Sequence, residues 1–168
     1  DDSTTVTGDT AGDVTEDGQL TDTATLTVTG DTGTRESDGS SAYGSWHVGT
    51  DGTWTYTLDN NSTAVQSLRG TDTKTDTFDV VSTDGSGVAH VTVSIHGTND
   101  AATVTNSTFV KAVKEDGVQT STGTVTISDV DSGEAGTQAV NGTTAHGSYT
   151  IDGAGHWSFT LNNSNAQV

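Results

Sequence analysis

Short segments in which apolar side chains alternate with Thr or Ser recur along the sequence, and they constrain the fold more than any other feature. Residues 25–28, 54–58 and 91–95 are clear examples. A period of two puts the apolar side chains on one face of a β-sheet. Asp-Gly dipeptides such as Asp51-Gly52 suit the tight turns between strands. The pattern predicts an all-β, Ig-like sandwich, with at most one short helical turn at 62–68.

The strand pattern occurs twice in the chain. Residues 14–18 (Val-Thr-Glu-Asp-Gly) return 99 positions later as Val-Lys-Glu-Asp-Gly, and residues 54–58 (Trp-Thr-Tyr-Thr-Leu) return 103 positions later as Trp-Ser-Phe-Thr-Leu. A repeat of about 100 residues has the size of an Ig-like sandwich rather than of a solenoid turn. We therefore expect tandem repeats at 1–100 and 101–168.

The second repeat is expected to be incomplete. Val168 corresponds to Val65, so the second repeat has no counterpart of the strands predicted over 75–83 and 88–95. A sandwich without these strands exposes an apolar face and open strand edges. Shortening of a longer chain is one explanation, and strands supplied by another chain are the alternative.

Charge and composition exclude several classes of function. The 168 residues include 23 Asp and Glu but only 5 Lys and Arg, which gives a net charge of -18. Such an acidic chain repels nucleic-acid phosphates and anionic membranes, and it has no apolar run long enough to insert into a membrane. The absence of Cys excludes disulfides and thiolate zinc sites. Neither a zinc-type His spacing nor a nucleophile motif occurs, so we do not expect an enzyme.

Several motifs occur together in a characteristic order. They are Val-x-Glu-Asp-Gly at 14–18 and 113–117, Gly-x-Trp-Thr-Tyr-Thr-Leu at 52–58, Asp-Gly-Ser-Gly at 84–87 and Asn-Asp at 99–100. In these motifs the chain resembles the VCBS repeat, a cadherin-like module found in tandem in large secreted bacterial adhesins of the repeats-in-toxin class. Where that family usually has Pro after Asn-Asp, this chain has two Ala residues.

The resemblance implies a role and a location. It implies secretion, display at the bacterial cell surface, and service as a calcium-stiffened extender that supports cell adhesion and biofilm formation. The implied partners are the neighbouring repeats of the same chain, with a host or surface ligand bound through other domains.

Topology predicts where acidic side chains meet. Successive loops of an Ig-like sandwich lie at alternating ends. Three segments should therefore share one end of the first repeat. They are the turn after a single strand at 3–14, the loop before the strand at 75–83 and the segment after the strand at 88–95. The loop after Ile127 in the second repeat is expected to face that end. The predicted metal ligands are Glu16, Asp17, Asp72, Asn99, Asp100, Asp129 and Asp131.

Calcium is the cation expected at this junction. Ca²⁺ takes six to eight oxygen ligands from carboxylates, amides, carbonyls and water. Without a cation the carboxylates repel one another, whereas a bound ion would hold neighbouring repeats in line. Asp and Asn are also ordinary turn residues, so each one alone is a weak signal. A weaker second site is expected from Asp1, Asp2 and Asp31 at the other end of the first repeat.

A ligand-binding adhesion module is the alternative function. Such a module would recognise a glycan or a surface protein through its loops or through exposed aromatic side chains. Trp46, Trp54 and Trp157 lie in the alternating segments or keep an aromatic counterpart in the other repeat, so we expect them in the core. Tyr43 aligns with His146 and is the aromatic residue expected to be more exposed.

Overall fold

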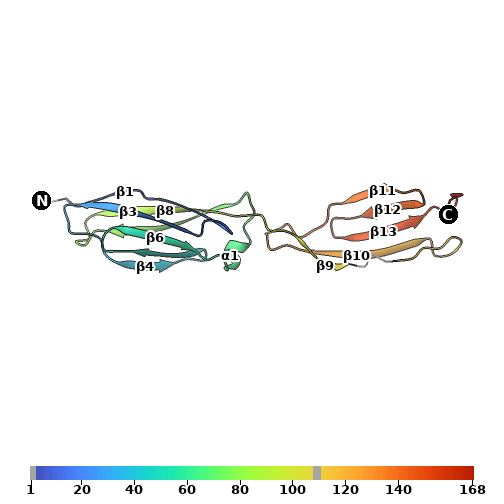
Figure 1. Cartoon of the computed structure of the whole chain (residues 1–168), viewed down its shortest axis with the longest axis horizontal. Helices are drawn as coiled ribbons and strands as arrows, with labels where there is room; N and C mark the ends of the chain where they lie inside the picture. Colours follow the sequence, from blue (N-terminus) through green and yellow to red (C-terminus); the bar gives the residue numbers. More distant parts are fainter. Residues whose placement is uncertain (1–2, 108–110) are drawn as a thin grey trace. The chain divides into compact units, whose positions relative to one another are not determined.

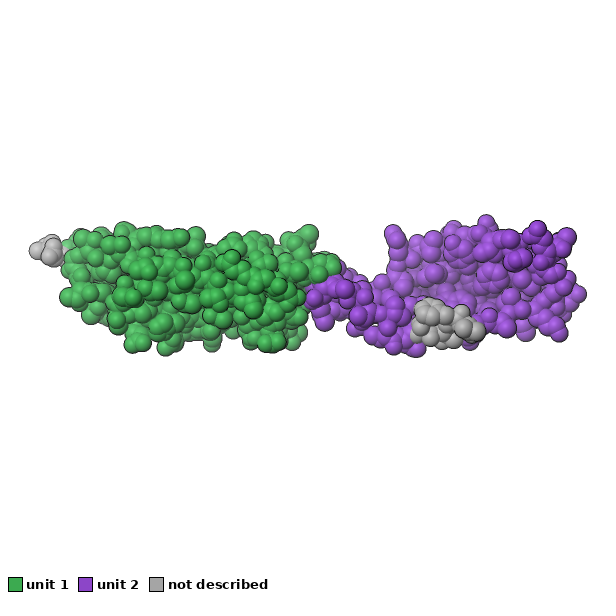
Figure 2. All heavy atoms as spheres, viewed as in Figure 1, with its two compact units in different colours: residues 1–99 green, residues 100–168 purple. Residues whose placement is uncertain are grey.

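The structure, a computed structural model, describes residues 3–107 and 111–168. The chain divides into two compact units, residues 1–99 and residues 100–168 (Figure 2). Strands form almost all of the regular structure, and the one helix among the described residues is a single turn. The predicted all-β class is therefore confirmed.

The first unit contains a five-stranded antiparallel sheet (Figure 1). Two of its strands contain the alternating segments at 25–28 and 54–58, and Ala24 lies directly opposite Trp54 in the register. Across this sheet the strands are β1 (Thr5–Gly8), β3 (Thr21–Thr29), β6 (Thr53–Leu58), β5 (Gly44–Val48) and β4 (Ser37–Ser40).

A three-stranded sheet completes the first unit. It consists of β2 (Ala11–Thr15), β8 (Val88–His96) and β7 (Thr73–Val81), with β2 parallel to β8 and β7 antiparallel to it. The prediction of one strand over 3–14 is wrong, because the chain leaves the first sheet after β1 and joins the second as β2. The break follows Gly8, whose φ of 136° is open to glycine but not to ordinary L-residues.

The core of the first unit lies between these two sheets. Trp54 and Tyr56 on β6 and Val93 on β8 are fully buried. Phe78 on β7 stacks on Trp46 with 5.2 Å between ring centroids and meets Trp54 edge-on at 5.9 Å. The two sheets are thus held by apolar contact, in the manner of a β-sandwich.

The polar atoms of the buried aromatic side chains are also satisfied. The indole Nε1 of Trp54 donates a 3.0 Å hydrogen bond to the carbonyl of Asp9. The hydroxyl of Tyr56 donates to the Asp76 carboxylate at 2.6 Å, and burial raises the pKa of this phenol. The predicted helical turn is α1 (Thr63–Gln66), where Ser62 caps the first turn and Val65 is fully buried.

The second unit repeats the five-stranded sheet with the same strand order. Gly123 faces Trp157 as Ala24 faces Trp54, and Tyr149 faces Phe159 as Trp46 faces Tyr56. Across the sheet the strands are β11 (Val140–Thr143), β12 (Gly147–Ile151), β13 (His156–Leu161), β10 (Thr120–Ser128) and β9 (Thr103–Ser107).

The described residues of the second unit form no second sheet. Residues 111–114, which correspond to part of β2, are not in a strand. In the first unit β2 pairs with β8, and the second unit has no strand at the corresponding place within its described residues. Every fully buried apolar side chain of the described core consequently belongs to the first unit.

Candidate functional site

Glu16 is a buried carboxylate at one end of the first unit. It directly follows β2, and only 1% of its surface is exposed. Its Oε2 accepts a 3.0 Å hydrogen bond from the amide of Thr98, and its carbonyl accepts one from the Thr98 hydroxyl at 2.6 Å. The Glu16 amide donates to the carbonyl of His96. Glu16 therefore joins the turn after β2 to the segment that leaves β8.

Asp72 and Asn99 lie at the same end of the first unit. The carbonyl of Asp72 accepts a hydrogen bond from the amide of Gly97, and Asn99 lies against Gly70, so that a Cβ added at this glycine would be 3.3 Å from the Asn99 nitrogen. The Asp72 carboxylate accepts from the main-chain amide of Arg69 at 3.2 Å, and this hydrogen bond is the main reason that the Asp72 pKa is lowered.

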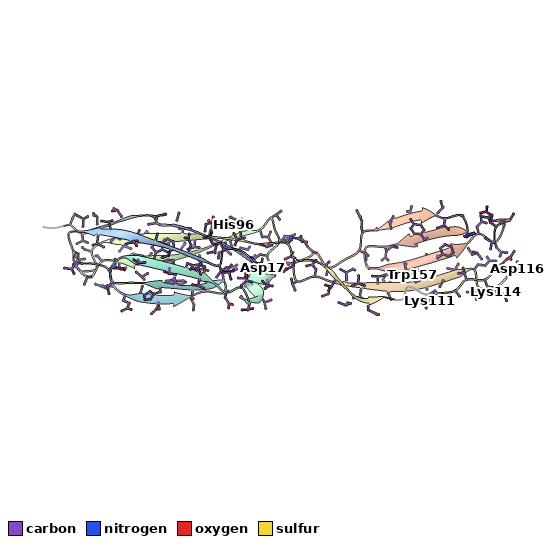
Figure 3. All side chains as sticks on the ribbon, viewed as in Figure 1. Asp17, His96, Lys111, Lys114, Asp116 and Trp157 are labelled. Carbon is purple, nitrogen blue, oxygen red and sulfur yellow. The ribbon has the colours of Figure 1, made fainter. Side chains whose placement is uncertain are left out.

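Asp17 is held by a reciprocal hydrogen-bond pair. Its amide donates to Oδ1 of Asn60 at 2.9 Å, and Nδ2 of Asn60 donates to Oδ1 of Asp17 at 2.7 Å. Asp116 and Asn163 form the same pair in the second unit, with distances of 2.9 and 3.0 Å. Figure 3 labels Asp17 and Asp116 on their turns. Both aspartates have a positive φ, 54° and 51° respectively. This geometry gives Asp17 a structural role in its turn, whether or not it also ligates a metal.

In the second unit, Asp100, Asp129 and Asp131 are linked by hydrogen bonds through their main chain. The amide of Asp131 donates to Oδ1 of Asp129 at 2.9 Å, and the amide of Asp100 donates to Oδ2 of Asp131 at 2.9 Å. The loop after the strand β10 thus meets the segment that enters β9. Asp100 is distant in sequence from Asp129 and Asp131 but is their neighbour here.

Asp131 stands out among them because it is buried and only partly satisfied. It is 2% exposed, and its Oδ1 has no hydrogen-bond partner in the described structure. No Lys, Arg or His in the described residues forms an ion pair with it. An ionised carboxylate without a compensating partner is costly to bury. The donor set therefore fits a hard cation, which takes carboxylate oxygens as ligands.

The structure places predicted ligands next to one another within each unit. Glu16, Asp72 and Asn99 share one end of the first, while Asp100, Asp129 and Asp131 are neighbours in the second. In the described part of the chain, no three His, Asp or Glu side chains converge closely enough to hold a metal by themselves. Ca²⁺ also accepts amide, main-chain and water oxygens. A single ion shared by all seven residues stays a prediction.

The other end of the first unit carries a second group of acidic side chains. Asp84 accepts hydrogen bonds from the hydroxyls of Ser82 at 2.6 Å and Thr4 at 2.9 Å, and its amide donates to Oδ2 of Asp31 at 2.7 Å. Hydrogen bonds from Ser82, and then from Ser86, lower the Asp84 pKa strongly. Asp1 and Asp2 lie outside the described residues, so the second predicted site is not tested.

The aromatic side chains bear on the alternative function. Trp46 and Trp54 belong to the core of the first unit as predicted. Tyr43, expected to be the more exposed aromatic residue, is half-buried and packs against the same core, as Trp46 does, whereas Trp54 is fully buried. Trp157 is also only half-buried, although its counterpart Trp54 is completely covered.

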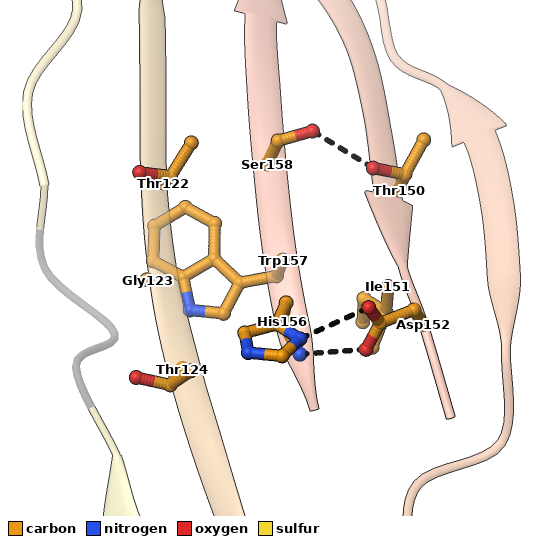
Figure 4. Close-up of a pocket in the computed structure, with 9 residues that line it drawn as sticks. All are labelled: Thr122, Gly123, Thr124, Thr150, Ile151, Asp152, His156, Trp157 and Ser158. Carbon is orange, nitrogen blue, oxygen red and sulfur yellow. Dashed lines mark hydrogen bonds and ion pairs between the residues drawn. The ribbon is translucent and has the colours of Figure 1, made fainter. Parts of the chain in front are cut away.

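A shallow hollow of about 500 Å³ lies on the sheet of the second unit (Figure 4). Thr122, Thr124 and Ser158 line it, and the Trp157 ring lies across Gly123. His156 contacts the Asp152 carboxylate through Nδ1 at 3.0 Å. The amide of His156 also bonds Asp152, and this hydrogen bond is the main reason that the Asp152 pKa is lowered.

Comparisons with known proteins leave the family undetermined. No protein-family model matches this chain, and no curated protein matches it in sequence. Among the described residues, no helix has the length and apolar character needed to cross a membrane.

Proposed function

We propose that the chain is a calcium-binding structural module, with Ca²⁺ held at the start of the second unit. The observation that carries this proposal is the buried Asp131 carboxylate, whose Oδ1 lacks a hydrogen-bond partner. Asp129 and Asp100 contact the same residue through hydrogen bonds. A divalent cation would neutralise this acidic group and supply the missing partner of Oδ1.

Residues at the end of the first unit would extend the ligand set. Asn99 directly precedes Asp100 in the chain. It is therefore next in sequence to one of the proposed ligands of the ion. Glu16 and Asp72 contact the segment 97–98 that leads to this bond. In this proposal Ca²⁺ restricts motion about the 99–100 connection and thereby stiffens the chain.

At the scale of the whole protein, we propose that these units are tandem Ig-like repeats of the VCBS type. The module would act as an extender of a secreted or surface-displayed bacterial adhesin and support adhesion and biofilm formation. Two features support the repeat: the matching sequence segments and the identical strand order of the two five-stranded sheets. The acidic charge of -18 favours a role that uses cations.

A glycan-binding module is the second candidate function. It is favoured by the Thr-lined hollow on the second unit, where the Asp152–His156 pair adds polar atoms. Glycan-array binding by the chain that is lost in Asp152→Ala would support this function. An array without any bound glycan would contradict it.

Calorimetric titration tests the calcium proposal. Extracellular calcium modules bind with dissociation constants of about 10⁻⁴–10⁻³ M, and we expect a value in this range. Asp131→Asn should weaken binding by about tenfold or more, since it removes a charged ligand. Glu115→Gln is the matched control, because it removes one charge from an exposed position of the same unit. No heat of binding, or equal affinities in both variants, would contradict the proposal.

The stiffening role needs a separate measurement. Small-angle scattering of the chain should show a narrower distribution of dimensions in Ca²⁺ than in EGTA, and Asp131→Asn should remove the difference. Identical scattering in both conditions, despite measurable binding, would leave calcium binding in place but reject its role as a stiffener.

A further inference from the structure

The loop that follows β10 in the second unit is longer than its counterpart after β3 in the first unit. Thr29 and Thr34 bound the loop of the first unit, and Ser128 and Thr137 bound that of the second. The first loop therefore has four residues and the second has eight. The shorter loop contains one acidic residue, whereas the longer one contains three.

Both loops end at the same anchor. The amide of Thr34 donates to the carbonyl of Thr50 at 3.0 Å, and its hydroxyl donates to the carbonyl of Gly49 at 2.6 Å. Thr137 makes the two equivalent hydrogen bonds 103 positions further along the chain, at 3.3 and 2.6 Å. The additional residues of the second unit thus extend a loop whose end is fixed in the same way.

The acidic residues of the two loops differ in how they are satisfied. In the shorter loop, Oδ1 of Asp31 accepts from the amide of Thr32 at 2.6 Å and Oδ2 accepts from the amide of Asp84 at 2.7 Å. In the longer loop, Asp131 is 2% exposed and its Oδ1 has no hydrogen-bond partner in the described structure. Buried polar atoms normally have such a partner, so the longer loop leaves one oxygen for a ligand.

The longer loop folds around Asp131 from both sides. The amide of Asp131 donates to Oδ1 of Asp129 at 2.9 Å, and the amide of Glu134 donates to the carbonyl of Asp131 at 3.3 Å. Gly133, the third residue of this second turn, has a φ of 80°, which is the value that a type II turn requires there. The Cα atoms at the two ends of such a turn lie within about 7 Å of each other. The turn therefore keeps Glu134 close to Asp131.

Glu134 has a carboxylate that is available for a ligand. Its side chain is exposed and makes no hydrogen bond or ion pair within the described residues. The other oxygen of the Asp131 carboxylate, Oδ2, is already held by the amide of Asp100 at 2.9 Å. Ca²⁺ takes six to eight oxygen ligands, so Asp129 and Asp131 do not fill its coordination shell by themselves.

We propose that Glu134 is a bidentate ligand of the ion bound at Asp131 and that it makes this site prefer Ca²⁺ to Mg²⁺. This inference rests on the calcium site proposed above and adds a residue outside the seven predicted ligands. A bidentate carboxylate suits the large and flexible coordination shell of Ca²⁺. Mg²⁺ is smaller, demands near-ideal octahedral geometry and keeps several of its waters, so it gains little from the second oxygen.

Calorimetric titration of the full chain with calcium chloride and with magnesium chloride tests this role. Glu134→Gln should raise the dissociation constant for Ca²⁺ about tenfold or more, and that for Mg²⁺ less than about threefold. Glu134→Asp keeps the charge but shortens the side chain, and it should also weaken Ca²⁺ binding about tenfold. Glu115→Gln is the matched control, since it removes an exposed charge from the same unit and should change either constant less than about twofold.

The outcomes distinguish this inference from the calcium site itself. No binding of Ca²⁺ by the native chain would reject both. Binding that is weakened in Asp131→Asn but unchanged in Glu134→Gln would keep the calcium site and overturn the role of Glu134. Equal losses for Ca²⁺ and Mg²⁺ in Glu134→Gln would also overturn it, because they indicate a general effect of charge rather than a bidentate ligand.

Two further measurements test the turn and the coordination mode. A Cβ at Gly133 would meet no atom within 4 Å, so Gly133→Ala disturbs only the backbone of the turn. This variant should weaken Ca²⁺ binding severalfold and leave the melting temperature in EGTA unchanged, whereas unchanged binding would contradict the positioning of Glu134 by the turn. The infrared difference spectrum between the Ca²⁺ and EGTA states should contain a bidentate-carboxylate band that is lost in Glu134→Gln and kept in Glu115→Gln. A band of equal intensity in both variants would overturn the proposal.

Discussion

The two units contain the same five-stranded sheet, yet within residues 3–107 and 111–168 a closed core is found in the first unit alone. Trp54 and Trp157 occupy equivalent register positions opposite Ala24 and Gly123, but Trp54 is fully buried and Trp157 is half-exposed. The difference lies in the layer formed by β2, β8 and β7, which covers the first sheet. Alternating sequence and hydrogen-bonded pairing are thus sufficient to specify a sheet, whereas burial requires a second apolar layer.

Replacement of the two tryptophans should show the largest difference between the units. Trp54→Ala removes a buried ring, its hydrogen bond to Asp9 and its contact with Phe78, and should cost about 3–5 kcal/mol of unfolding free energy. Trp157→Ala removes a half-buried ring and should cost about 1–2 kcal/mol. Urea denaturation followed by circular dichroism measures both values.

One result would contradict the expected difference between the two tryptophans. Equal losses of unfolding free energy in Trp54→Ala and Trp157→Ala would mean that the sheet of the second unit is as well covered as that of the first. Trp46→Phe serves as the control in the first unit, because it keeps an aromatic ring against Phe78 and should cost less than Trp54→Ala.

The paired Asp–Asn turns should show a smaller and more equal effect. Asn60→Ala and Asn163→Ala each remove a side chain that both accepts from and donates to an aspartate with positive φ. Each should lower the unfolding free energy of its own unit by about 1 kcal/mol, since these hydrogen bonds are exposed. Hydrogen exchange at the two turns localises the change. Unchanged protection of the turn amides from hydrogen exchange in both variants would contradict a structural role of these Asp–Asn pairs.

The pH dependence of Asp84 should give the smallest effect. Its pKa in the folded state is lower than the ordinary value of 3.8, so its hydrogen bonds stabilise the first unit at higher pH. That contribution is lost as the pH falls below the unfolded pKa toward the folded one. The melting-temperature gap between the native chain and Asp84→Asn should therefore narrow from about pH 6 to about pH 2. A gap that widens toward acid would contradict the lowered pKa.

Much of the strand pattern follows from local sequence. Alternation identifies the segments 25–28, 88–95 and 157–161, because one face of each strand is apolar. The strand Ser37–Ser40 has no apolar residue and escaped prediction. It forms because it pairs with β5 at the sheet edge, where a Cβ at Gly39 would be 2.2 Å from the Trp46 ring. Such a strand is specified by its neighbour rather than by its own sequence.

The candidate site was partly accessible to the same reasoning. Alternation of loop ends correctly placed Glu16, Asp72 and Asn99 at one end of the first unit. The burial of Asp131 could not be predicted, since it depends on tertiary contacts rather than on the spacing of two aspartates. The partners Asn60 and Asn163 were missed, although they recur 103 positions apart like the tryptophans. Recurrence of a polar residue opposite a turn was the signal that could have identified them.

Residue-resolved NMR during calcium titration tests the central claim most directly. The account predicts saturable shifts that begin at the amides of Asp100 and Asp131, both of which donate to carboxylates of the proposed site. Asp84 and Asp152, which also accept hydrogen bonds but lie elsewhere in the fold, should shift much less. Weak, non-saturating shifts spread over all the acidic loops, with no preference for Asp100 and Asp131, would contradict it.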